Sequence, residues 1–290
     1  MQNLQTMRNI GIIAHIDAGK TTTTENMLYF SGLIHRVGNI DDGTTVMDYL
    51  DEERARGITI VAAAATFQWR DCLIHLIDTP GHIDFTAEVE RSLRVIDGAV
   101  VIFSGVEGVE AQSEKVWRQA EHYRVPRLAF INKLDRLGAS FDRVLDEINS
   151  KFDGLAVALQ VPVGIEAYFE AIVDLVSMTV IRFEGDNHEV VARTAIPDGL
   201  RDEMLTRRER LIERLADHSD AIAALFLEGE AIPEAVLKRA IRAQTMANRI
   251  VPVLTGSAKG RLGVQPLMDA VVDYLPSAAD VGRVQATRVK

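Results

Sequence analysis

The sequence lacks cysteine pairs, any long apolar run and an excess of positive charge. Cys72 is the only cysteine among 290 residues, which excludes an internal disulfide and a cysteine-rich metal centre and suits a reducing compartment. No apolar run approaches the roughly 20 residues that a membrane-spanning helix needs, so we expect no membrane partner. The predicted first strand begins at Ile10, which leaves no room for a signal or transit peptide. A cytoplasmic location is therefore expected.

The charge balance narrows the possible partners further. Lys and Arg number 32 against 42 Asp and Glu, so the formal net charge is −10. An acidic protein does not coat nucleic acid indiscriminately, and any nucleic-acid partner must be met by a local site. Apolar residues make up 47% of the sequence, enough for a sizeable core, and the length predicts one large domain or two.

The stretch from Ile10 to Thr24 carries the strongest motif. An apolar strand predicted over 10–14 runs into a turn, and a helix is predicted over 20–31. The pattern is that of the phosphate-binding loop, G-x-x-x-x-G-K-[ST], except that its first position is alanine. Lys20 is expected to reach the β- and γ-phosphates and Thr21 to ligate Mg²⁺. The alternative is an ordinary strand-to-helix turn. The expected nucleotide-binding residues are Ala14, His15, Ile16, Asp17, Ala18, Gly19, Lys20, Thr21 and Thr22.

A second element follows the helix. Residues 33–57 show no clean period, and so long a loop in a compact domain is uncommon unless it is functional. Just after it, within Arg56–Ile60, Thr59 is expected to add its hydroxyl or carbonyl to the metal only when the γ-phosphate is present. A plain surface loop leading into a strand is the alternative.

A third element ends the second of two strands predicted over 61–69 and 73–77. Asp78 stands where a carboxylate can hold a Mg²⁺-bound water, and Gly81 offers an N–H to the γ-phosphate without a Cβ in the way. His82 is expected to position the attacking water, the alternative being a structural histidine. The nucleotide-binding residues expected here are Asp78, Thr79, Pro80, Gly81 and His82.

Two further elements are expected to read the base. Guanine presents two donors on one edge, N1–H and the exocyclic amine, and one carboxylate accepts both. Asp135, at the end of an N-K-x-D pattern that follows a strand over 127–131, is expected to select GTP over ATP. A strand predicted over 250–254 precedes the last wall of the pocket. The residues assigned to the base are Asn132, Lys133, Leu134, Asp135, Ser257, Ala258 and Lys259.

The spacing of these elements predicts an insertion. Far more residues separate Asp135 from Ser257 than one helix and one strand need. We expect a nucleotide-binding domain over 1–156 and 249–290, and an inserted α+β subdomain over 157–248 with strands at 159–163, 172–175 and 178–183 before a helical part. Alternating strands and helices predict a doubly wound, mostly parallel α/β sheet. The charged helical faces are either solvated surface or a partner-docking surface.

The segments AHIDAGKT, RGITI, DTPGH, NKLD and GSAK resemble the translational GTPases. The phrases VPVG, VDLV and GVQPLMDAVVDYLPS resemble the elongation factor G family, and the resemblance covers essentially the whole chain. It implies a P-loop NTPase fold of the Ras-like kind, a G domain with an inserted G′ subdomain, and hydrolysis of GTP to GDP and phosphate on the ribosome.

The same resemblance implies roles for single residues. Thr59 would be the metal-sensing residue of switch I, and 78–82 would form switch II. Ile16 and Ile58 match a hydrophobic pair that flanks the catalytic His82, which the sarcin–ricin loop of the large ribosomal RNA would turn towards water. Asp17 matches an aspartate implicated in binding a monovalent cation and in ordering that histidine. The acidic insert would dock the ribosomal stalk protein, and a monomer is expected.

Members of that family continue for several more domains, whereas this chain stops at Lys290. We therefore expect a fragment or a truncated relative without the downstream domains, and no translocation by this chain alone. Two alternatives stay open: the same domain of a ribosome recycling or antibiotic-protection factor, and a GTP-dependent binding switch with negligible turnover. His82 argues against the switch, which does not need it.

Overall fold

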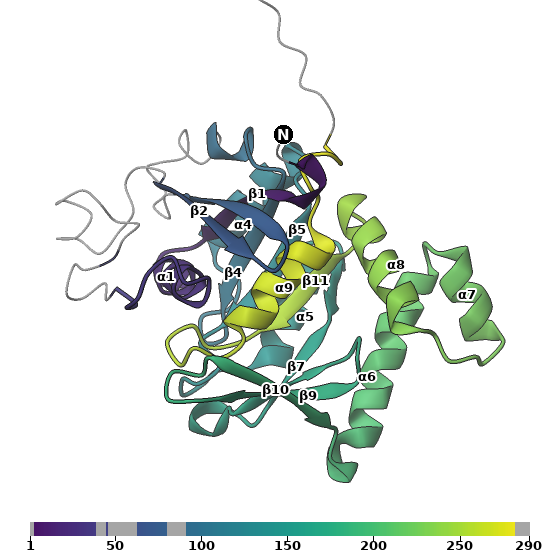
Figure 1. Ribbon diagram of the computed structural model, residues 1–290. Helices are drawn as coiled ribbons and strands as arrows, with labels where there is room; N and C mark the ends of the chain where they lie inside the picture. The colour runs from purple at the N-terminus through teal and green to yellow at the C-terminus, as the bar shows by residue number, and fades with distance from the viewer. Residues whose placement is uncertain (1–2, 39–44, 46–62, 80–90, 282–290) are drawn as a thin grey trace, which may run out of the picture.

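The computed structural model describes residues 3–38, 45, 63–79 and 91–281, and within these ranges the larger sheet has seven strands in the order β2–β3–β1–β4–β5–β11–β6 (Figure 1). Their bounds are β1 Met7–Ala14, β2 Ala63–Trp69, β3 Cys72–Asp78, β4 Gly98–Ser104, β5 Arg127–Asn132, β6 Ala156–Ala158 and β11 Val251–Thr255. Among these strands only β2 and β3 pair antiparallel. The predicted mostly parallel α/β sheet is confirmed.

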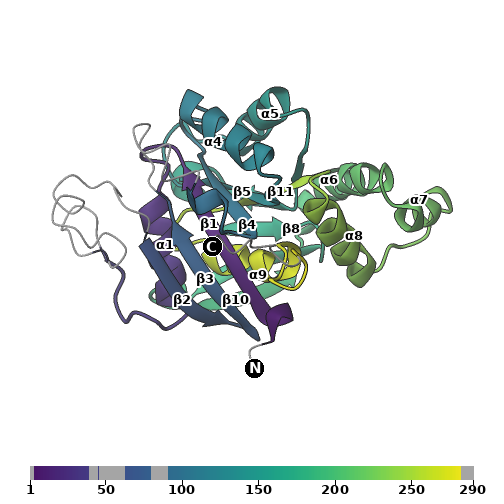
Figure 2. The same ribbon diagram turned by 90° about the horizontal axis from the view of Figure 1, so that it is seen from above.

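Helices cover both faces of this sheet. Figure 2 shows α4 (Ala111–His122) and α5 (Phe141–Lys151) on one side, and α1 (Lys20–Phe30) and α9 (Val264–Tyr274) on the other. β4 and β5 are buried at every position, as a parallel sheet between two helical layers requires. Neighbouring side chains of β4 point to opposite layers: Ile102 packs in the cluster that contains Met27 and Leu267, and Phe103 in the cluster that contains Trp117 and Val144.

The parallel arrangement gathers several loops at one edge of the sheet. Ile12 of β1 is in register with Asp78 of β3, and Ser104 of β4 with Asn132 of β5. β11 runs parallel to β5 on its other side. The loops that follow β1, β3, β5 and β11 therefore leave from the same edge, which is where open α/β sheets bind ligands.

The strands that come after β6 in the sequence form a second, antiparallel sheet. Its order is β10–β9–β8–β7, with β7 Gln160–Val163, β8 Ala171–Asp174, β9 Thr179–Glu184 and β10 Val190–Ala195. Three helices follow, α6 Asp198–Ala216, α7 Asp220–Leu227 and α8 Glu234–Met246. Two short 3₁₀ helices lie at Leu4–Thr6 and Glu166–Tyr168.

Two strands of this region were not predicted. β6 pairs with β11 and so extends the large sheet, which places the expected domain boundary at residue 157 inside a strand of that sheet. β10 is exposed along most of its length and lacks an apolar side to mark it in the sequence. The division into a G domain and an inserted subdomain stays a prediction.

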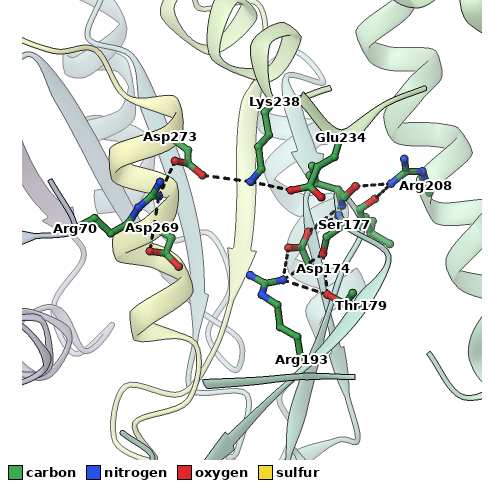
Figure 3. A network of polar contacts seen from close by, with 12 residues as sticks. Arg70, Asp174, Ser177, Thr179, Arg193, Arg208, Glu234, Lys238, Asp269 and Asp273 are labelled. Atoms are coloured by element: carbon green, nitrogen blue, oxygen red, sulfur yellow. Dashed lines mark hydrogen bonds and ion pairs between the residues drawn. The ribbon is translucent and has the colours of Figure 1, made fainter. Parts of the chain in front are cut away.

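Charged side chains connect the two regions. In Figure 3, Asp273 of α9 lies between Arg70, 2.7 Å away in the β2–β3 turn, and Lys238, 3.8 Å away on α8. Deeper in the second sheet, Arg193 forms an ion pair with Asp174 at 3.0 Å. These pairs are partly exposed, so each contributes at most about 1 kcal/mol. Of the three, the Lys238–Asp273 pair joins α8 to α9.

No helix within the described ranges is long and apolar enough to cross a membrane.

The contact between α5 and α6 gives a pH-dependent prediction. Arg207 donates to both carboxylate oxygens of Asp142, at 2.7 and 3.0 Å, and these hydrogen bonds hold the pKa of the Asp142 carboxyl below its usual range. Asp142→Asn is expected to lower the free energy of unfolding at pH 7 by roughly 0.5–1 kcal/mol, because the carboxylate is largely exposed.

A depressed pKa stabilises the fold above the unfolded-state pKa, and that contribution is lost as the pH falls through the folded-state value. The difference between wild type and Asp142→Asn in urea unfolding should thus be full at pH 7 and shrink below about pH 4. Asp146→Asn, an exposed position on the same helix, serves as the control. A difference that does not change with pH would contradict this account of the pair.

Candidate functional site

The phosphate-loop motif lies where the sequence predicts it. β1 ends at Ala14, the turn covers 15–19, and α1 begins at Lys20. Gly19 adopts a left-handed φ of 94°, and a Cβ there would overlap the side-chain nitrogen of Asn132. Asp17 also has a positive φ, 62°, and is exposed. The backbone conformation at residue 19 and its close approach to Asn132 therefore favour glycine, which has no side chain.

A buried ion pair joins the loop to the end of β3. Lys20 Nζ lies 2.7 Å from Asp78 Oδ2, and the two side chains are 8% and 0% exposed. Thr79 donates its hydroxyl to the Ile12 carbonyl at 2.7 Å, which fixes the end of β3 against β1. Two buried charges in contact are costly to desolvate, so this is an unusual place for a purely structural pair.

The same place offers oxygen ligands suited to a hard cation. Thr21 is buried at the start of α1 beside Lys20, and Asp78 stands on the neighbouring strand end. A hydroxyl and a carboxylate are the donors that Mg²⁺ prefers, so the residues present fit the expected magnesium site. Within the described ranges no cluster of three or more histidine, cysteine or acidic side chains forms a different metal site.

The first turn of α4 holds the other side of the phosphate loop. Gln112 Oε1 accepts the Ile16 N–H at 3.2 Å, and the Ser113 hydroxyl lies 3.1 Å from His15 Nδ1. His15 is 2% exposed, and burial lowers the pKa of its imidazole, so the ring stays neutral at pH 7. His15 is therefore a fixed part of the loop.

Asn132 connects the phosphate loop with the loop after β11. Its Nδ2 donates to the Ala18 carbonyl at 2.8 Å, and its Oδ1 accepts the Ala258 N–H at 2.8 Å. The Ala258 carbonyl in turn accepts from Asn26 Nδ2 of α1 at 3.0 Å. The predicted phosphate and base elements thus share one buried hydrogen-bonded chain.

The other residues predicted to bind the base lie on the loops that follow β5 and β11. Asp135 is half-buried, and its carboxylate makes no hydrogen bond with any described residue. Lys133 lies 3.4 Å from Glu107, and Leu134 is buried. Ser257 is buried and its hydroxyl accepts the Gly260 N–H, whereas Lys259 is exposed.

Five predicted site residues lie outside the described ranges. They are Ile58, Thr59, Pro80, Gly81 and His82. Their expected roles in metal sensing, phosphate sensing and catalysis stay predictions. Ile16, the other member of the expected hydrophobic pair, is 38% exposed.

Three residues that hold the site were not predicted. Asn26, Gln112 and Ser113 belong to no motif, and each contacts a partner far away in the sequence. The sequence offered one indication of these contacts: Asn26 and Ser113 are polar residues on the buried faces of α1 and α4. Buried polar side chains usually have a hydrogen-bond partner.

Comparison with known families accounts for this arrangement. The profile of the family described as Elongation factor Tu GTP binding domain matches residues 5–277. The chain belongs to this family. An elongation factor G from Petrotoga mobilis is 51% identical over 283 residues, covering 98% of this chain and 41% of the relative. An elongation factor G from Thermotoga maritima is 48% identical over 287 residues, covering 99% of this chain and 42% of the relative.

A solved structure has the same fold. A crystal structure of a protein from Thermus thermophilus matches with a TM-score of 0.88 and 26% identity, covering 96% of this chain and 41% of that one. The resemblance to the elongation factor G family inferred from the sequence is confirmed. The chain spans about two fifths of the length of these relatives.

The close approach of Gly19 to Asn132 gives a prediction. Gly19→Ala should weaken binding of Mg²⁺·GDP about tenfold or more, because the added methyl group must displace Asn132 and because alanine is strained at this φ. Gly32, just beyond the other end of α1, has a φ of 78° but nothing within 4 Å of an added Cβ, so Gly32→Ala carries only the backbone strain.

Fluorescence titration with a labelled GDP distinguishes the two variants. Gly32→Ala should be less stable yet bind GDP like wild type. Equal loss of affinity in both variants would show that backbone strain, and not the contact with Asn132, governs the site.

Proposed function

We propose that this chain is the GTP-binding and GTP-hydrolysing domain of a translocase-type elongation factor G. One observation carries the proposal: Asn132 links the Ala18 carbonyl of the phosphate loop to the Ala258 N–H, while the Asp135 carboxylate bonds to no described residue. The names of the relatives support it, since elongation factors of this family are GTPases.

Base selection is assigned to Asp135. Its carboxylate is half-buried and would accept both N1–H and the exocyclic amine of guanine, whereas adenine offers no such pair. A carboxylate left without partners when adenine occupies the pocket would cost roughly 1–3 kcal/mol or more. Ser257 and Ala258 would brace the base by backbone N–H groups and by packing, and Lys259 would lie along its face.

Phosphate binding is assigned to the loop amides, Lys20 and Thr21. Lys20 would exchange its ion pair with Asp78 for the β- and γ-phosphates, which leaves Asp78 to hold a metal-bound water. Thr21, Asp78 and, from switch I, Thr59 would hold Mg²⁺, which when bound neutralises charge on the phosphate oxygens. Asp17, exposed at its positive φ, would face a monovalent cation.

Hydrolysis is assigned to His82. The neutral, buried His15 is held by Ser113, so it is not a candidate for positioning water. His82 would pass between Ile16 and Ile58 when the sarcin–ricin loop of ribosomal RNA orders it. Gln112 fixes the backbone of Ile16 and so one side of that passage.

The proposed setting is the cytoplasmic ribosome. The charged faces of α6 and α8 in the inserted G′ subdomain would dock the stalk protein, and the chain would act as a monomer.

Asp135→Asn tests the base assignment. An amide accepts at one oxygen and donates at its nitrogen, so it matches xanthine better than guanine. The variant should lose GDP affinity by roughly tenfold or more and gain affinity for XDP, measured by competition against a labelled nucleotide. Unchanged discrimination among GDP, XDP and ADP would refute the pocket assignment.

Single-turnover hydrolysis of GTP with and without ribosomes tests the enzymatic assignment. We expect slow hydrolysis by the chain alone and faster hydrolysis with ribosomes, and His82→Ala should greatly slow the reaction while leaving GTP affinity nearly intact. Hydrolysis that ribosomes do not change would favour a binding switch. A large loss of affinity in His82→Ala would count against a role in the transition state.

A further inference from the structure

Asn26 lies in the second turn of α1, outside every nucleotide-binding motif. Its Nδ2 donates to the Thr22 carbonyl at 2.8 Å and to the Ala258 carbonyl at 3.0 Å, and the side chain is 1% exposed. The second of these hydrogen bonds joins α1 to the loop after β11, which lies 232 positions away in the sequence.

The contact fixes the orientation of a single residue from two sides. Asn132 Oδ1 accepts the Ala258 N–H at 2.8 Å while Asn26 holds the Ala258 carbonyl. The Ala258 carbonyl also accepts the Arg261 N–H at 3.1 Å, but that bond lies within the same loop, whereas the bond from Asn26 ties the loop to α1. The 257–259 loop therefore cannot rotate against α1 without breaking a buried hydrogen bond. Because α1 begins at Lys20, the same helix carries the lysine assigned to the phosphates and the asparagine that bonds to the 257–259 loop.

Packing alone does not account for an asparagine at this position. Its Oδ1 is buried and has no hydrogen-bond partner among the described residues. An apolar side chain of similar shape would avoid that penalty and keep the contacts of α1. Asparagine at this position therefore stabilises the fold less than an apolar residue would, but it provides a hydrogen bond to the 257–259 loop.

We propose that Asn26 is a positioning residue for guanine nucleotides, which sets the 257–259 loop against the base by holding the Ala258 carbonyl. The proposal rests on the proposed function, because it needs the base to lie against this loop. The effect of Asn26 on the nucleotide would pass through Ala258 and not through a direct contact.

Asn26→Leu separates this role from stability, because leucine keeps the branched shape and removes the unpartnered oxygen. The variant should unfold at the same temperature as wild type or higher, yet bind Mg²⁺·GDP about five- to tenfold more weakly, chiefly through faster dissociation. Inorganic pyrophosphate, which uses only the phosphate loop, should compete with unchanged affinity. Asn26→Ala, which leaves a small cavity, should show the same loss for GDP.

Gln244→Leu is the matched control in α8. Gln244 Nε2 donates to the Leu215 carbonyl at 2.8 Å, and its Oε1 is likewise buried without a partner among the described residues, but both residues lie in the helices that follow the second sheet. This variant should bind GDP within about twofold of wild type.

Two results would overturn the proposal. Asn26→Leu could bind GDP like wild type, or GDP and pyrophosphate could weaken by the same factor, which would place the effect in the phosphate loop. A wild-type chain that binds pyrophosphate but shows no preference for GDP over ADP would instead overturn the proposed function.

Discussion

The side-chain amide of Asn132 is the interaction on which the site depends. It stands at the end of β5, which lies between β4 and β11 in the sheet. Its two ends are used in opposite senses, donating to Ala18 and accepting from Ala258, both at 2.8 Å. The phosphate loop and the base loop therefore cannot move independently. The parallel sheet makes this possible, because it brings the carboxyl ends of β1, β5 and β11 to one edge.

The electrostatics of the site are those of a place prepared for a charged ligand. Lys20 and Asp78 are nearly fully buried in contact, an arrangement whose desolvation cost is offset only by good geometry or by a ligand. Two other titratable side chains of the site are neutral or paired. His15 is neutral because burial lowers the pKa of its imidazole, and Lys133 is paired with Glu107.

The sequence predicted the elements whose signal is local. The fully buried strands β4 and β5 read as apolar runs, and Gly19 and Asn132 belong to motifs whose residue types follow from phosphate and base chemistry. The sequence did not predict elements and contacts that depend on a distant segment of the chain. β10 is mostly exposed and so lacks an apolar pattern. β6 has only three residues and is recognised as a strand by its pairing with β11. Asn26 has its hydrogen-bond partner at Ala258, far away in the sequence. Such contacts depend on how distant segments meet, which local periodicity does not encode.

Isothermal titration calorimetry of the purified chain with nucleotide diphosphates in the presence of Mg²⁺ tests the central claim most directly. If one linked pocket grips the phosphates and reads guanine, GDP should release heat and bind at a single site per chain, while ADP at the same concentrations should release none. No heat with GDP, or equal affinity for GDP and ADP, would contradict the account.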